Sequence, residues 1–343
     1  MARIEQIHDW LRAQFPERAF TLAPASNDAS FRSYLRVKFG GDVANKAAAG
    51  ETLIVMDAPP PHEDVRPWLH VQQLFHAAGA RVPDVLAEDR ERGFLLIADL
   101  GATTYLAALE HGEADPLYRT AIDTLIDIQR HSRPDTLPAY DRTLLLRELN
   151  LFPDWYIERH LPINFGNEQR NILAAVFEKI LAVNLAEPRV YVHRDYHSRN
   201  LMVSAAQEDP RPGVIDFQDA VYGPLSYDLV SLLKDAYIEW DEERALDWLA
   251  RYWEKARQIG LPVSADFGAF FRAYEWMGVQ RHVKVLGIFA RLCHRDGKDG
   301  YLKDMPLVAK YLRAACARYG ELTPLLRLLD KLENRQVQAG YTF

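Results

Sequence analysis

The chain has 343 residues, of which 48% are hydrophobic and 26% charged, so it can bury a core in two lobes or domains, and wholesale disorder is disfavoured. A formal net charge of −7 argues against nucleic-acid binding, which usually requires a basic surface. The two cysteines, Cys293 and Cys316, show neither a disulfide framework nor metal-ligand spacing, which fits a reducing compartment. No segment resembles a signal peptide or a membrane-spanning helix, so we expect a cytoplasmic protein with no membrane partner and no evident protein partner.

The first hundred residues predict a small lobe that is rich in strands. Runs of β-forming residues alternate with turn-forming segments, and a Gly/Ala-rich stretch at 40–50 predicts the connection of a hairpin. A segment with helical periodicity follows Asp64 and ends at Gly79. The predicted elements are a helix at the N-terminus through residue 11, strands at 33–39, 52–56, 82–87 and 93–97, and a helix at 65–78. We assign residues 1–98 to this N-terminal lobe.

The remaining residues, 99–343, predict a larger and mostly helical lobe. Apolar residues recur three or four positions apart, which is typical of amphipathic helices. Three short strand-like segments interrupt this pattern and enclose loops rich in charged and amide side chains. The predicted helices are 105–110, 116–131, 142–160, 167–185 and a helical region from 226 to about 332, and the strands are 189–192, 201–204 and 214–217. The expected fold class is therefore α+β.

The strongest chemical signal is the segment His193-Arg194-Asp195-Tyr196-His197-Ser198-Arg199-Asn200, which is followed further along the chain by Ile215-Asp216-Phe217. Phosphoryl transfer requires a carboxylate near the acceptor hydroxyl and oxygen ligands for magnesium. Magnesium is a hard cation, so the oxygens of Asn200 and Asp216 suit it better than histidine nitrogens would. These residue types predict a phosphoryl-transfer site in loops between short strands.

With this motif the chain resembles the aminoglycoside-phosphotransferase and choline-kinase-like branch of the protein-kinase-like, two-lobed fold. The resemblance implies that ATP and Mg²⁺ are the cofactors and that Asp195 accepts or orients the acceptor proton. It further implies that Asn200 holds one metal ion, that Asp216 bridges metal and phosphates, and that His193 anchors the loop. A second match, Gly223-Pro224-Leu225-Ser226-Tyr227-Asp228-Leu229, implies that Asp228 is a structural carboxylate that steadies the loop.

The N-terminal lobe departs from the usual kinase pattern, because neither a Gly-x-Gly-x-x-Gly loop nor a strand lysine is plain. Met56 stands near the position expected for that lysine, and Arg32, Arg36 or magnesium alone would have to meet the phosphate charge. Small and polar residues at 25–34 could instead present backbone amides to phosphate. The predicted nucleotide contacts are Ser30, Phe31 and Arg32 in this loop, and Asp99 and Leu100 where the resemblance places the adenine-binding hinge. These departures leave a non-catalytic nucleotide-binding module as an alternative.

The acceptor is predicted to be a small molecule. Only about a dozen residues separate Asp216 from Asp228, which leaves little room for the activation segment with which protein kinases bind peptides. Basic residues in the late helical region suit an anionic or neutral acceptor, although the same pattern also fits a solvated helix face. These residues are Arg281, His282, Lys284, Arg291, His294, Arg295 and Lys298.

Further phrases at 29–34, 56–60, 152–156 and 280–287 are similar to the anomeric amino-sugar kinases of bacterial cell-wall (peptidoglycan) recycling. This resemblance implies phosphorylation of the C1 hydroxyl of N-acetylmuramate and N-acetylglucosamine to the α-1-phosphate. Trp155 could stack on a pyranose or belong to the core, and Glu148 and Asp154 could bind the sugar or be surface charges. The candidate substrate contacts are Glu148, Asp154, Trp155, Arg281 and His282. Choline, homoserine and aminoglycosides stay open as alternative acceptors.

Overall fold

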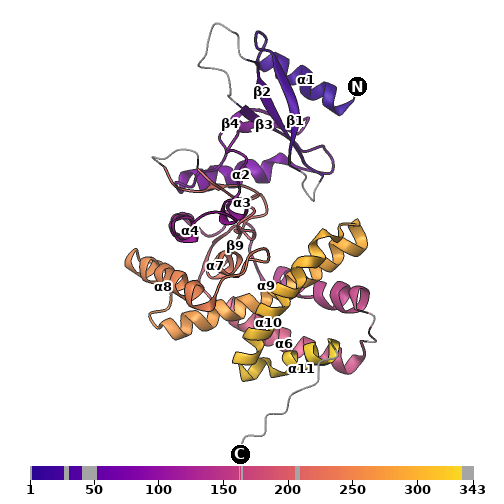
Figure 1. The fold of residues 1–343 in the computed structure, drawn as a ribbon, viewed down its shortest axis with the longest axis vertical. Helices are drawn as coiled ribbons and strands as arrows, with labels where there is room; N and C mark the ends of the chain where they lie inside the picture. Colours follow the sequence, from indigo (N-terminus) through magenta and orange to yellow (C-terminus); the bar gives the residue numbers. More distant parts are fainter. Residues whose placement is uncertain are drawn as a thin grey trace, which may run out of the picture. The chain divides into compact units, whose positions relative to one another are not determined.

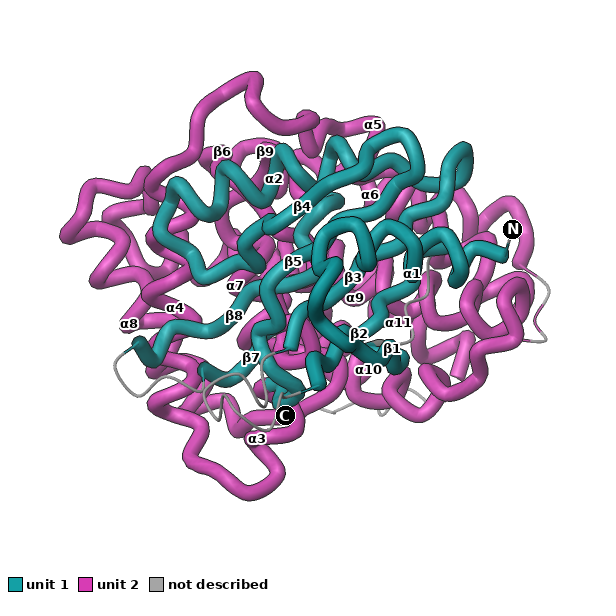
Figure 2. Tube along the Cα trace, turned by 90° about the horizontal axis from the view of Figure 1, so that it is seen from above, with its two compact units in different colours: residues 1–104, 201–219 teal, residues 105–200, 220–343 magenta. Residues whose placement is uncertain are grey.

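The computed structural model describes residues 2–26, 31–40, 52–161, 163, 165–204 and 209–333. The chain forms two compact units, and Figure 2 shows them in different colours. Unit 1 consists of residues 1–104 and 201–219, and unit 2 consists of residues 105–200 and 220–343. Unit 1 therefore contains, besides residues 1–98 of the predicted N-terminal lobe, the segments 99–104 and 201–219, which we expected in the C-terminal lobe.

Unit 1 is built on a five-stranded antiparallel sheet with the strand order β1-β2-β3-β5-β4. Helix α1 covers this sheet, because its apolar residues, Trp10 and Leu11 among them, pack with Val37, Val55 and Leu96 of the strands. Figure 1 labels α1 beside the strands. The elements are α1 (Arg3–Gln14), β1 (Phe20–Ser26), β2 (Ser33–Phe39), β3 (Thr52–Asp57), α2 (Val65–Ala77), β4 (Val85–Asp89), β5 (Phe94–Ala98), β7 (Leu201–Met202) and β8 (Gly213–Val214).

The first strand, β1, was not predicted from the sequence. It contains Pro24, which has no backbone N–H to donate, and its end overlaps the stretch that was interpreted as a phosphate-binding loop. Proline is tolerated here because β1 is an edge strand that pairs only with β2. The predicted hairpin of β2 and β3 is present, with Ser33 opposite Asp57 and Lys38 opposite Thr52.

The short hairpin of β7 and β8 explains why residues 201–219 belong to unit 1. Gly213 forms a bridge with Arg81, and the backbone amide of Val203 donates to the carbonyl oxygen of Thr103 at 2.9 Å. Phe217 packs its ring 5.0 Å from that of Trp68 in α2. Both strands are shorter than predicted, since only two residues of each form ladder pairs.

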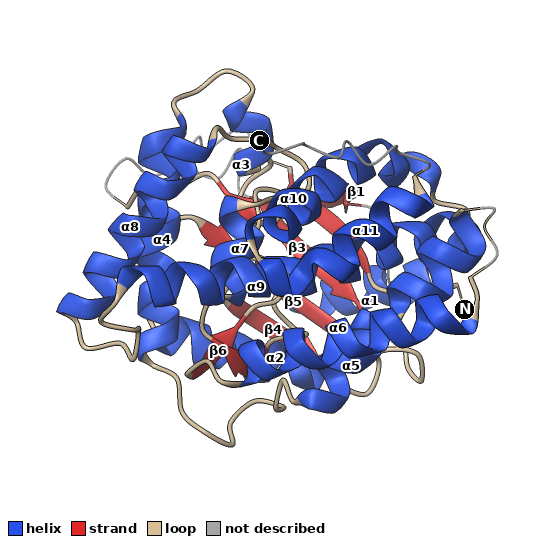
Figure 3. Ribbon diagram, turned by 90° about the horizontal axis from the view of Figure 1, so that it is seen from below, coloured by secondary structure: helices blue, strands red, loops and turns tan. Residues whose placement is uncertain are grey.

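Unit 2 is mostly helical and contains one small ladder, in which β6 and β9 pair antiparallel. Helix α9 has 30 residues and packs against α6, α7, α10 and the π-helix η1. Figure 3 shows α9 running among α6, α7 and α10. Within the described part of the chain, no helix has the length and apolar character required to cross a membrane. The elements are α3 (Tyr105–Leu109), α4 (Ala114–Arg130), α5 (Arg142–Leu149), η1 (Phe152–His160), α6 (Asn167–Leu185), β6 (Arg189–Val192), β9 (Val221–Pro224), α7 (Tyr227–Leu233), α8 (Glu242–Gln258), α9 (Phe267–Asp296), η2 (Asp299–Asp304), α10 (Met305–Arg318), η3 (Gly320–Leu322) and α11 (Thr323–Leu332).

The single helix predicted for 142–160 is two elements. Helix α5 ends at Leu149, and a π-helix follows from Phe152, with Pro153 in its first turn. Proline cannot donate the backbone hydrogen bond that an uninterrupted α-helix needs at this position. Helix α9 also approaches closely, since a Cβ on Gly287 would lie 2.4 Å from the carbonyl carbon of Leu151. The break therefore lies where two helices touch through their backbones.

Candidate active site

The segment from His193 to Asn200 follows β6 directly and forms a loop anchored by a buried carboxylate. The two oxygens of Asp228 in α7 accept hydrogen bonds from the backbone amides of His193, at 2.7 Å, and Arg194, at 3.0 Å. Arg194 has a φ of 77°, which is uncommon for a residue with a side chain, and these bonds hold it there. Burial raises the pKa of Asp228 to about 7, although its backbone donors act in the opposite direction. Asp228 thus has the surroundings of a carboxylate that supports the loop.

A second buried carboxylate anchors the other half of the loop. Asp235 accepts hydrogen bonds from the backbone amide of Ser198, at 2.9 Å, and from the Ser198 hydroxyl, at 2.5 Å. The hydroxyl of Tyr196 donates to the carbonyl oxygen of Ala121 in α4 at 2.8 Å. Nδ1 of His193 accepts the backbone N–H of Asp195 at 3.3 Å. These hydrogen bonds therefore hold the loop in a defined shape, as catalytic groups require.

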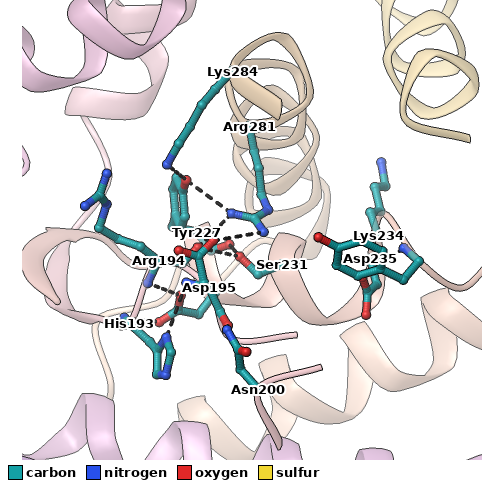
Figure 4. A network of polar contacts seen from close by, with 12 residues as sticks. His193, Arg194, Asp195, Asn200, Tyr227, Ser231, Lys234, Asp235, Arg281 and Lys284 are labelled. Atoms are coloured by element: carbon teal, nitrogen blue, oxygen red, sulfur yellow. Dashed lines mark hydrogen bonds and ion pairs between the residues drawn. The ribbon is translucent and has the colours of Figure 1, made fainter. Parts of the chain in front are cut away.

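Asp195 presents its carboxylate from this loop, and 45% of its side chain is exposed. Figure 4 shows Arg281 and Lys284 extending from α9 toward Asp195 and Tyr227. Nη2 of Arg281 lies 3.7 Å from Oδ1 of Asp195. Desolvation by the surrounding protein acts to raise the pKa of Asp195, but Arg281 and Lys284 outweigh it, so the pKa lies well below its ordinary value. Asp195 is consequently ionised throughout the neutral pH range.

Glu148 lies among the cations beneath the loop. Its side chain is buried, at 4% exposure, and it forms ion pairs with Arg194 and with Lys284, whose Nζ lies 3.1 Å away. The hydroxyl of Tyr140 also donates to this carboxylate. Burial acts to raise the pKa of Glu148, but Lys284 and Arg194 lower it below its ordinary value. The alternative that Glu148 is a surface charge is wrong, and its role as a sugar contact stays a prediction.

The other predicted substrate residues have different surroundings. Arg281 reaches the loop, where its Nη1 donates to the carbonyl oxygen of Arg194 at 2.7 Å. His282 is buried, and its ring stacks on that of Tyr311 at 5.3 Å. Burial, together with Lys234 and Arg281, holds the pKa of His282 well below its ordinary value, so the ring is neutral. On η1, Asp154 is exposed and Trp155 is half-buried.

In unit 1, Asp99 is surrounded by donors. Its carboxylate accepts from Nε of Arg36 at 2.6 Å, from the Thr52 hydroxyl at 2.7 Å and from the backbone amide of Gly101 at 2.9 Å. Burial acts to raise the pKa of Asp99, but Arg36 and Thr52 lower it. The guanidinium of Arg36 is therefore paired with Asp99, which makes it a poor substitute for the strand lysine. Met56, at the position expected for that lysine, is fully buried.

The remaining predicted nucleotide contacts also belong to unit 1. Phe31 is 68% exposed and stacks on His62 with ring centroids 4.9 Å apart, and Arg32 is half-buried. Leu100 lies against the β7–β8 hairpin, where its side chain closely approaches Gly213. Ser30 falls outside the residues that the structure describes.

The two predicted magnesium ligands belong to different units. Nδ2 of Asn200 donates to the carbonyl oxygen of Asp195 at 3.0 Å in unit 2, which orients the amide. In unit 1, Asp216 has a φ of 64° and accepts from Nε2 of Gln218 at 3.0 Å. Among the described residues, no group of three or more His, Cys, Asp or Glu side chains could hold a metal ion. The oxygens of an amide and of a carboxylate are ligand types that magnesium accepts, and the ion usually keeps several water ligands.

Two residues of this site were not singled out from the sequence. Asp235 anchors the loop through Ser198, and Tyr227 accepts a hydrogen bond from Nζ of Lys284 at 2.8 Å. A weak sequence signal for Asp235 exists, because it is an acidic residue just beyond the end of α7, the helix that carries Asp228. Tyr227 gave no such signal, since its partner comes from a distant helix.

The chain is similar to known proteins over most of its length. The sequence model of the phosphotransferase enzyme family matches residues 21–261. Two curated proteins named N-acetylmuramate/N-acetylglucosamine kinase are similar over almost their whole lengths: one from Neisseria meningitidis is 47% identical (100% of both chains), and one from Pseudomonas aeruginosa is 48% identical (96% of this chain and 97% of the relative).

Solved structures agree at the level of the fold. The choline kinase LicA from Streptococcus pneumoniae has a TM-score of 0.60 at 16% identity and covers 91% of this chain and 100% of its own. The aminoglycoside phosphotransferase APH(2'')-Ib in its ADP-bound form has a TM-score of 0.54 at 16% identity, with 90% and 96% covered. The predicted kinase-like α+β fold is thus confirmed, as is the resemblance read from the catalytic loop. The chain belongs to the phosphotransferase enzyme family.

Proposed function

We propose that this protein is a kinase that transfers the γ-phosphoryl group of ATP to the anomeric C1 hydroxyl of N-acetylmuramate and N-acetylglucosamine, giving the α-1-phosphate for peptidoglycan recycling. The names of relatives that are 47% and 48% identical over nearly the full chain support these acceptors. The observation that carries the proposal is the ionised Asp195 on a loop anchored at both ends by Asp228 and Asp235. Consumption of ATP makes the cytoplasm the expected location.

The electrostatics of Asp195 favour an acidic acceptor hydroxyl. A carboxylate beside Arg281 and Lys284 is a weak base, so it orients the hydroxyl and takes its proton only late in the transfer. The anomeric hydroxyl suits such a base, because the ring oxygen withdraws electron density and makes this hydroxyl more acidic than an ordinary alcohol. The acceptor oxygen forms its bond to phosphorus as the bond to the leaving ADP breaks, and Asp195 receives the proton.

Asn200 and Asp216 would hold the magnesium ion. When bound, Mg²⁺ neutralises negative charge on the phosphates during transfer. Ser30, Phe31, Arg32, Asp99 and Leu100 are the proposed nucleotide contacts. Asp154 and Trp155 on η1 remain candidate sugar contacts, since both side chains are at least partly open to solvent.

The decisive experiment incubates the protein with ATP, magnesium and each amino sugar, and identifies the product by phosphorus NMR. A resonance coupled to the anomeric proton is the expected result. Phosphate at C6, or no transfer to either amino sugar, would refute the proposed acceptor. Choline, homoserine and an aminoglycoside in the same ADP-release assay test the other acceptor classes, and ATP binding without any turnover would indicate a non-catalytic nucleotide-binding module.

A further inference from the structure

Arg199 immediately precedes Asn200 in the loop and is a cation held by aromatic rings. Its guanidinium lies 3.8 Å from the ring centroid of Tyr237 and 5.9 Å from that of Tyr301. The side chain is half-buried, and no carboxylate in the described ranges forms an ion pair with it. Most other arginines of the loop and of α9 have such partners, for example Arg194 with Glu148 and Arg281 with Asp195. A cation in a fixed place, on which the carboxylate of Asp304 acts only from beyond ion-pair distance, is suited to an anionic ligand.

The aromatic support of Arg199 is itself anchored to the catalytic loop. The backbone amide of Tyr237 donates to Oδ1 of Asp235 at 3.1 Å, and the other oxygen of this carboxylate holds Ser198. The rings of Tyr237 and His197 form a T-shaped pair with centroids 5.4 Å apart. Asp235 therefore fixes the loop and the ring under Arg199 together, which keeps the position of the guanidinium defined.

Tyr237 also relates Arg199 to the catalytic carboxylate. Burial raises the pKa of Tyr237, the positive charge of Arg199 opposes this rise, and the negative charges of Asp235 and Asp195 add to it. Arg199 and Asp195 thus lie close enough to the same phenol to act on its ionisation. Arg199 and Asp195 belong to the same short loop, His193 to Asn200, so a sugar bound at Asp195 is expected to have Arg199 near it.

The two proposed acceptors differ in one charged group. N-Acetylmuramate is N-acetylglucosamine with a lactyl ether, so it carries a carboxylate where the other sugar has a hydroxyl. We propose that Arg199 binds this carboxylate and makes the enzyme prefer carboxylate-bearing amino sugars to neutral ones. The inference rests on the proposed function. An arginine can bind both oxygens of a carboxylate at once, and the Tyr237 face shields the pair from water on one side.

The test compares Arg199→Gln with the unaltered protein on both sugars. We expect the ratio of kcat/KM for N-acetylmuramate to kcat/KM for N-acetylglucosamine to decrease by a factor of about ten to about a hundred. This is the range expected for losing a hydrogen bond to a charged group. The change should lie mainly in KM, because the carboxylate is remote from the reacting atoms and contributes equally before and during transfer. Arg199→Lys should retain part of the preference, since it keeps the charge but not the planar fork.

Direct binding separates recognition from turnover. The dissociation constants of the 1-deoxy analogues of both sugars, measured by calorimetry, should show the same loss of preference in Arg199→Gln. Arg189→Gln, which changes an exposed arginine at the start of β6, is the matched control and should leave the ratio unchanged. An unchanged ratio in Arg199→Gln, or equal loss for both sugars, would overturn the inference while leaving the kinase assignment intact. If the unaltered protein phosphorylates neither sugar, the proposed function fails and this inference fails with it.

Discussion

Replacing Glu148 with glutamine tests whether this residue is an internal counter-ion or a sugar contact. Glutamine has nearly the same shape but no charge, so Glu148→Gln leaves Lys284 and Arg194 facing a neutral amide in a buried place. Removing one partner of a buried ion pair typically costs about 3–5 kcal/mol, because an uncompensated charge stays out of water. Since Arg194 is partly exposed and Lys284 is not, we expect about 3 kcal/mol, most of it from Lys284.

The assay is urea unfolding followed by tryptophan fluorescence, with kcat and KM measured on the same preparations. The double variant Glu148→Gln/Lys284→Met removes both charges and should recover much of the lost stability, because the two residues are coupled. The single variant Glu148→Gln should therefore be less stable than the double variant. A loss below about 1 kcal/mol together with a large increase in the KM for the sugar would refute the counter-ion reasoning and favour a direct sugar contact.

Three further predictions concern catalysis, packing and pH. Asp195→Asn should lower kcat at least about a hundredfold while calorimetry still detects ATP binding, and a normal rate would remove this carboxylate from the mechanism. Gly287→Ala should destabilise the protein by about 1–3 kcal/mol in urea unfolding, because the new methyl group would overlap the carbonyl group of Leu151, although alanine by itself favours helices. The control is Gly300→Ala, whose new methyl group would meet no atom within 4 Å. Equal stabilities of the two variants would contradict the close approach at Gly287. Burial raises the pKa of Glu187 to about 7 from an ordinary 4.5, so the folded state retains a proton that the unfolded state loses, and stability should fall as the pH rises from about 4.5 to about 7, by at most about 1.4 kcal/mol per pH unit from this group. Glu187→Gln should remove that contribution from the pH dependence of unfolding, and an identical dependence in both proteins would show that this carboxyl does not titrate in that range.

Elements with strong local periodicity were predictable from the sequence. The helix at 167–185 coincides with α6, and the helix at 65–78 and the strand at 33–39 match α2 and β2 within a residue. Each carries its own signal, because apolar spacing and turn residues act over only a few neighbours. The break at Pro153 and the strand around Pro24 were missed, since proline is compatible with a helix start, an edge strand and a loop alike.

The sequence by itself determined the chemistry of the loop, because the order and spacing of Asp195, Asn200 and Asp216 identify a phosphoryl-transfer motif without coordinates. Only the tertiary structure decided what surrounds that loop. Glu148 lies among Arg194 and Lys284, and Arg199 lies on Tyr237, in contacts between residues far apart in the chain. Electrostatic energies depend on distance and burial in space rather than on separation along the sequence, so a charged residue that reads as a surface group can prove to be a buried counter-ion.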